Sequence, residues 1–281
     1  MTEEIKDLAP IKPEEPKTNS PEAHEEQKMP FMSHLSELRT RIMICLGSIM
    51  VCFCVTFTYS EELFNFMLLP LKKDLVFQLT RPFLHFIDRP GAVVSLVFLE
   101  PAEAFWMQLK VAMIAGVIIS IPIILMQLWL FIAPGLKQAE RKYLLPFIIA
   151  GTGLFSMGAT FCFLVILPFA LSFLLTYKTA SLTPMLSVGH YVDFILKFVL
   201  AFGIVFELPI VLLLLTRLGV ITPKKLAQNR KYAIVIAFIA AGILTPTPDA
   251  FNQTLMAVPI IMLYEIGIIA SRIFYVEKKT V

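Results

Sequence analysis

The stretch LLPFIIAGTGLFSMGATFCFLVILPFALSFLL, residues 144–175, decides the fold of this chain. It contains no Asp, Glu, Lys or Arg, and it exceeds the roughly 20 apolar residues that a helix needs to cross about 30 Å of hydrocarbon. Backbone N–H and C=O groups cannot remain unpaired in lipid, and a helix pairs them within one segment. The alternating pattern of a barrel strand is absent from the sequence. The stretch therefore predicts a membrane-spanning helix.

Five further apolar stretches surround this span. They lie at about 42–59, 104–132, 188–215, 232–244 and 251–275. Of all 281 residues, 57% are hydrophobic and 16% are charged, whereas soluble domains carry about 25% charged residues. We therefore predict an all-α integral membrane protein with six transmembrane helices.

The fifth stretch is short for a span. At 1.5 Å per residue, 232–244 reaches only about 20 Å, less than the hydrocarbon thickness. Pro246 and Pro248 follow it and oppose a longer helix, although a helix that continues past Thr245 is the alternative. We predict that transmembrane helices 5 and 6 form a short hairpin, accommodated by bilayer thinning or by neighbouring helices.

The segments outside the spans are polar. Residues 1–30 contain five prolines and eight acidic residues against four lysines, a net charge of −4 (4 − 8). Such a segment cannot bury enough apolar surface to fold, which predicts a disordered cytoplasmic tail at 1–30, a membrane domain at 31–276 and a cytoplasmic tail at 277–281. The segment between the first two spans is long for a bare loop, so short helices or turns on the membrane surface are expected there.

The distribution of lysine and arginine predicts the orientation. One side of the membrane collects 13 of these residues and the other side five, and basic short loops remain cytoplasmic. Both termini are therefore predicted to be cytoplasmic (N-in, C-in).

The sequence carries no motif of an enzyme or cofactor site. It has no P-loop, no G-x-G-x-x-G, no G-x-S-x-G and no zinc-ligand pattern. The four cysteines lie in apolar stretches, where a free thiol behaves as a small hydrophobic side chain. We expect no enzymatic activity, cofactor, metal or nucleic-acid partner.

Charged side chains inside spans are candidate functional positions, because charge is costly in hydrocarbon. Glu207 precedes Pro209, which bends a helix by removing a hydrogen-bond donor. Glu207 either bonds a neighbouring helix or contacts a passing polar ligand or partner. Lys197 lies about 15 Å away on the same helix, too far to pair with Glu207, and is expected to snorkel toward the interface.

Further polar residues occur in or beside the spans: Gln127, Gln253, Glu265, Lys110 and Glu103. Each alone is more typical of an interhelical hydrogen bond than of a site. As a group with Glu207, they indicate a groove of some polarity.

Two carboxylates lie on the cytoplasmic side, outside the spans. Glu37 shares a helix face with His34 and Arg41, and a Glu37–Arg41 pair is the alternative to a binding role. Glu140 is either a solvated loop charge or a binding group. Carboxylates bind guanidinium groups bidentately, so the two together could hold two adjacent arginines of a peptide.

These residues lie in segments that resemble the TatC family of twin-arginine protein translocases. The similar segments are HLSELRTR (34–41), FIAPGL (131–136) with the following Glu140-Arg141, AFGIVFELP (201–209), and LTPTPD (244–249) with QT (253–254) and EIG (265–267). The resemblance covers about residues 30–276. The tail before Met29 and the region around 77–94 are longer than the family pattern, and Lys197 departs from it.

The resemblance implies a curved, glove-like bundle in a bacterial inner membrane and a role in protein export. It implies that Glu37 and Glu140, with Leu136 and Arg41, bind twin-arginine signal peptides, and that Glu207 lies in a concave face. It further implies a core subunit that works with the single-span subunits TatA and TatB, self-associates in the bilayer, and exports folded proteins using the proton-motive force.

Two other functions remain open from the residues themselves. A proton-coupled transporter would use Glu207, Glu265 and Lys197 as a relay, but no internal repeat is visible. An insertase-type subunit would bind hydrophobic helices and would give Glu37 and Glu140 no role.

Overall fold

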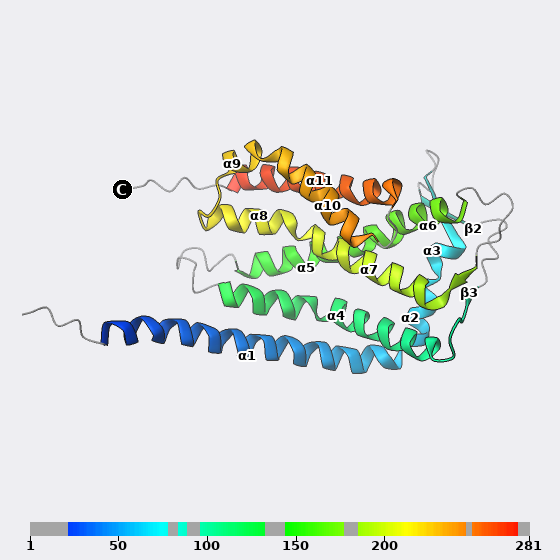
Figure 1. The fold of residues 1–281 in the computed structure, drawn as a ribbon, viewed down its shortest axis with the longest axis horizontal. Helices are drawn as coiled ribbons and strands as arrows, with labels where there is room; N and C mark the ends of the chain where they lie inside the picture. Colours follow the sequence, from blue (N-terminus) through cyan, green and yellow to red (C-terminus); the bar gives the residue numbers. More distant parts are fainter. Residues whose placement is uncertain are drawn as a thin grey trace, which may run out of the picture. The chain divides into compact units, whose positions relative to one another are not determined.

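The computed structural model describes residues 22–77, 84–88, 96–132, 144–176, 185–245 and 249–274. The chain divides into two units, Met1–Thr40 and Arg41–Val281. The second unit contains the helical bundle, whose long helices run along a common direction (Figure 1).

Long helices account for most of the described residues. Their bounds are Glu22–Thr58 (α1), Glu103–Ile132 (α4), Leu144–Phe161 (α5), Leu167–Thr176 (α6), Val188–Phe206 (α7), Leu208–Arg217 (α8), Arg230–Leu244 (α10) and Ala250–Phe274 (α11). A π-helical turn, Cys162–Ile166 (η3), joins α5 to α6. Within the part of the chain that the structure describes, five segments are long and apolar enough to cross a membrane: α1, α4, α5–η3–α6, α7–α8 and α11. They match five of the six predicted spans.

The α10–α11 hairpin follows the prediction only in its first helix. α10 has 15 residues, so its shortness is confirmed. α11 has 25 residues, or about 37 Å at 1.5 Å per residue, so the prediction that helix 6 is also short is wrong. Pro259 lies within α11 without ending it, because membrane helices tolerate proline where neighbours satisfy the freed backbone groups.

α1 begins at Glu22, inside the segment 1–30 that composition assigned to a disordered tail. The sequence EAHEEQKM at 22–29 has no glycine or proline and consists largely of good helix formers, which explains an earlier start. The rest of that tail and residues 277–281 lie outside the described residues.

The segment between α1 and α4 contains strands as well as the expected short helices. α2 (Ser60–Met67) and α3 (Leu69–Lys72) are followed by β1 (Lys73–Phe77), which pairs antiparallel with β2 (Leu84–Asp88). β3 (Leu96–Val97) pairs in parallel with β4 (Leu186–Ser187), just before α7. The expected short helices are present as α2 and α3. The strands were not predicted, and the β3–β4 pairing joins segments about 90 residues apart that no local pattern connects.

Glycines allow α5 and α7 to approach closely. A Cβ atom on Gly158 would lie 2.6 Å from Cγ of Phe206, and one on Gly203 would lie 2.5 Å from the Phe155 ring. In lipid, helices associate through such close packing rather than through the exclusion of water. α7 therefore lies at the centre of the packed bundle.

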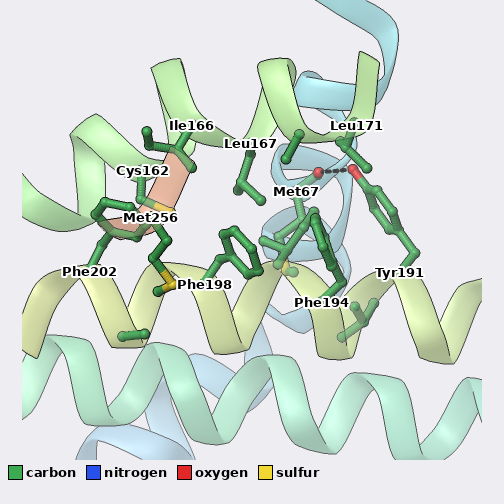
Figure 2. Close-up of a cluster of buried hydrophobic side chains, with 14 of the residues drawn as sticks. Met67, Cys162, Ile166, Leu167, Leu171, Tyr191, Phe194, Phe198, Phe202 and Met256 are labelled. Carbon is green, nitrogen blue, oxygen red and sulfur yellow. Dashed lines mark hydrogen bonds between the residues drawn. The ribbon is translucent and has the colours of Figure 1, made fainter. Parts of the chain in front are cut away.

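The largest buried cluster surrounds α7 (Figure 2). Phe198 and Phe202 of α7 point toward Leu167 and Met256 of the neighbouring helices. At the edge of the cluster, the Tyr191 hydroxyl donates a hydrogen bond of 2.7 Å to the Met67 carbonyl, which ties α7 to the end of α2.

Candidate functional site

Glu37 lies on α1, one turn after His34. Oε2 of Glu37 is 3.9 Å from Nδ1 of His34, and the Glu37 side chain is 32% exposed. The carboxylate is thus accessible on the helix surface. Glu140 and Leu136 lie outside the described residues, so the paired-carboxylate clamp remains a prediction.

Arg41 and Gln127 were predicted for different sites, but the structure brings them together. Nη1 of Arg41, on α1, donates a hydrogen bond of 3.0 Å to Oε1 of Gln127, on α4. Gln127 is only 6% exposed. A guanidinium bound to a buried amide fixes the side chains of both helices at this crossing.

Glu207 occupies the break between α7 and α8. Pro209 sits in the first turn of α8, and the backbone N–H of Glu207 reaches back to the Ile204 carbonyl, a tighter turn than an α-helix makes. The carboxylate faces α5: a Cβ on Gly151 would lie 3.1 Å from Oε2 of Glu207.

Oε1 of Glu207 is buried and has no hydrogen-bond partner among the described residues. The predicted alternative, a carboxylate bonded to a neighbouring helix, is therefore unsupported within this part of the chain. A buried acceptor without a donor costs free energy, so it is a position where a ligand or partner would gain a hydrogen bond.

Gln253 and Glu265 have partners within the hairpin. Nε2 of Gln253 donates a 3.0 Å hydrogen bond to the Phe238 carbonyl of α10, so this side chain forms the interhelical hydrogen bond expected of it when taken alone. Glu265 forms a bidentate pair with Arg230, with Nε–Oε1 and Nη2–Oε2 distances of 2.8 Å. Its side chain is 39% exposed.

No two of these four polar residues share a hydrogen-bond partner among the described residues: Gln127, Glu207, Gln253 and Glu265. Among the grooves between the described helices, three have mostly apolar linings, and none of the four residues lines these three. The predicted groove of shared polarity therefore remains a prediction. The described residues hold no cluster of His, Cys, Asp or Glu suited to a metal.

Sequence reasoning missed Asp193. Oδ1 and Oδ2 of Asp193, on α7, lie 2.8 and 3.0 Å from Nζ of Lys110, on α4. The two side chains are 37% and 44% exposed, and the pair joins two candidate spans. Lys197 was recognised as a charged residue within this helix, but Asp193, four residues earlier, was not. A count of every ionisable residue in each span would have found it.

Glu103 was predicted only as a polar residue at the entrance of a span. Its carboxylate accepts hydrogen bonds from the Ser187 hydroxyl, the Gly189 N–H at 2.6 Å and the Leu99 N–H at 2.6 Å. A weaker bond of 3.4 Å comes from the Glu100 N–H. A carboxylate is favourable at a helix N-terminus, so Glu103 anchors the start of α7 to the start of α4.

Known proteins resemble this chain over most of its length. Residues 33–259 match the family model described as Sec-independent protein translocase protein (TatC). The chain is 40% identical over 247 residues to the TatC protein of Magnetococcus marinus, covering 88% of this chain and 85% of the relative. It is 38% identical over 255 residues to that of Aquifex aeolicus, covering 90% of this chain and 99% of the relative.

A solved structure shares the fold. The crystal structure of a twin-arginine translocase receptor, TatC, superimposes with a TM-score of 0.72 at 38% sequence identity. It covers 85% of this chain and 98% of that chain. The chain belongs to the TatC family of Sec-independent protein translocase proteins.

Proposed function

We propose that this chain is the signal-peptide receptor of a twin-arginine translocase, exporting folded proteins across a bacterial inner membrane with the proton-motive force. The observation that carries the proposal is the match, at 38% identity over nearly the whole length of the other chain, to a solved twin-arginine translocase receptor. Its partners are twin-arginine signal peptides, the single-span subunits TatA and TatB, further copies of the chain, and the lipid bilayer. Both termini lie in the cytoplasm.

The chemistry of Glu37 supports this role. A third of its side chain is exposed, so the carboxylate can accept two parallel hydrogen bonds from a guanidinium group. Lysine offers a single point charge instead of a planar fork, so the site prefers arginine. Glu140 supplies the second carboxylate, and Leu136 contacts the apolar part of the peptide beside it.

Glu207 supplies a second contact within the membrane. Its buried Oε1, for which the described residues offer no donor, accepts a hydrogen bond from a polar group of the signal peptide or of a partner helix. Such a bond forms only in the complex, so it favours the docked state over the resting receptor.

Site-specific photocrosslinking in native membranes tests the proposal. A photoreactive residue at position 37 or 140 should crosslink a peptide with Arg-Arg strongly and its Lys-Lys counterpart weakly. Glu37→Ala and Glu140→Ala should each weaken binding of the Arg-Arg peptide more than Lys137→Ala, the matched control in the same loop as Glu140. Reversal to Arg should be worse than Ala.

Equal crosslinking of the two peptides would contradict arginine recognition. The chain would then bind hydrophobic helices without reading their basic residues, as an insertase-type subunit does.

A further inference from the structure

A groove of about 510 Å³ lies between α8, α10 and α11. It follows α10 from Asn229 to Ala240. Those 11 steps of 1.5 Å give a length of about 16 Å, close to half of the roughly 30 Å hydrocarbon thickness. The groove is therefore as long as one leaflet of the bilayer.

The lining changes from polar to apolar along this length. Asn229, Tyr232 and Tyr264 lie at the end where α10 begins, and Ala240 and Ile260 lie at the deeper end. The Tyr264 hydroxyl donates a hydrogen bond of 2.9 Å to the Leu226 carbonyl, which holds the ring at the mouth. A ligand that matches this lining has a polar head and an apolar tail.

The polar end of the groove is cationic. Nζ of Lys231 lies 5.1 Å from the centroid of the Tyr232 ring, so an ammonium group stands beside a residue of the mouth. At the same end of the bundle, where α8 and α11 end and α9 (Pro223–Gln228) and α10 begin (Figure 1), the described residues of these helices include six cations against Glu265. They are Arg217, Lys224, Lys225, Arg230, Lys231 and Arg272.

We propose that this groove binds an anionic phospholipid, with one acyl chain between α8, α10 and α11 and the phosphate headgroup at Asn229, Tyr232 and Lys231. Basic pockets between transmembrane helices on the cytoplasmic side attract anionic headgroups. The cationic mouth favours this occupant over an apolar partner helix, because a phosphate group complements the positive charge there.

The bound lipid has a structural role at α10. This helix is too short to cross the bilayer, and a lipid held along its side covers the apolar residues that line the groove. The role concerns lipid rather than signal peptides, and it stands independently of the proposed receptor function.

Photolabelling of the purified full-length chain in lipid nanodiscs tests the proposal. The probes are phosphatidylglycerol and phosphatidylcholine with the same photoreactive diazirine on one acyl chain, and mass spectrometry locates the label. Phosphatidylglycerol should label the groove residues of α8, α10 and α11, with phosphatidylcholine at least fivefold weaker. Lys231→Gln should lower phosphatidylglycerol labelling about fivefold, the effect of one basic side chain near an anionic headgroup.

Two matched substitutions on α10 test the groove itself. Ala233→Phe fills the lining and should abolish the label, whereas Val235→Phe adds a ring at an exposed position of similar depth and should preserve it. If Ala233→Phe does not give folded protein, Lys231→Gln still tests the proposal, because its side chain is exposed. Equal labelling by both lipids, or labelling spread evenly around α10, would overturn the proposal.

Discussion

Of the residues in the most apolar stretch of α1, 6% are buried. In the most apolar stretch of the span formed by α7 and α8, 50% of the residues are buried. The mean hydropathies of the two stretches, 2.0 and 2.7, both indicate a membrane span and do not foretell this difference. Apolar side chains are equally favourable facing lipid or facing another helix, so hydropathy does not identify the packed face. Contacts of small and polar residues identify it.

α7 is held along its length by Gly203 against Phe155, by Glu103 at its start and by Asp193 in between. Among the described residues from Arg41 onward, hydrogen bonds join α1 to α4 at two places. Near its end, the Thr56 hydroxyl donates a 2.7 Å hydrogen bond to the Ala112 carbonyl, and Arg41 bonds Gln127 at the other place. α7 is thus packed against its neighbours along its length, whereas α1 contacts α4 at separate positions.

The largest expected effect comes from overpacking α7. Gly203→Leu places side-chain atoms where the Phe155 ring lies, and should cost about 3 kcal/mol of stability. Thermal unfolding of the purified protein in detergent measures the loss. The control is Gly47→Leu on α1, where an added Cβ meets nothing within 4 Å, and stability should stay within about 0.5 kcal/mol or rise. Equal losses from both variants would erase the difference between the two helices.

A smaller effect is expected where α1 crosses α4. A Cβ on Gly116 would lie 2.9 Å from the backbone nitrogen of Phe53 and 3.0 Å from its Cα. Because backbone cannot swing aside, Gly116→Val should cost about 2 kcal/mol and loosen α1 alone. Hydrogen exchange should rise along α1 and stay unchanged in α5 and α7. Exchange rising equally in all three helices would show that α1 is part of the same cooperative unit.

The Lys110–Asp193 pair tests how charge holds α7. Lys110→Met leaves a carboxylate without its partner in the membrane and should cost about 1–2 kcal/mol, less than a fully buried pair because both side chains are partly exposed. The double variant Lys110→Met/Asp193→Leu should recover most of the loss. Thermal unfolding of the three proteins measures this. If the double variant were less stable than Lys110→Met alone, the ion pair itself would stabilise the contact between α4 and α7.

The smallest effect is expected at the Arg41–Gln127 contact between α1 and α4. A double-mutant cycle of Arg41→Ala and Gln127→Ala should give a coupling of about 0.6 kcal/mol, the average for interhelical hydrogen bonds in membranes. A coupling near zero would mean that the Arg41–Gln127 hydrogen bond adds no stability and that the Thr56–Ala112 contact holds α1 against α4.

The chemistry of individual stretches was readable in advance. Residues 144–175 predicted a span because their composition alone is compatible with hydrocarbon, and the short fifth helix followed from two prolines after Leu244. The segment HLSELRTR and its companions identified the family, because these residues stand in order along one chain. Glu207 was recognisable as unusual, since an acid in a span is costly wherever it points.

The partners of those residues required the tertiary structure. Lys110 and Asp193 are 83 residues apart, Arg41 and Gln127 are 86 apart, and Glu103 meets Gly189 across the same distance in sequence. A helix in lipid carries no polar face to show which neighbour it will meet, because every side of it is apolar. Sequence alone therefore determined that these segments enter the membrane as helices. Only the folded bundle decided which side chains within it are satisfied, and which, like Oε1 of Glu207, have no donor among the described residues.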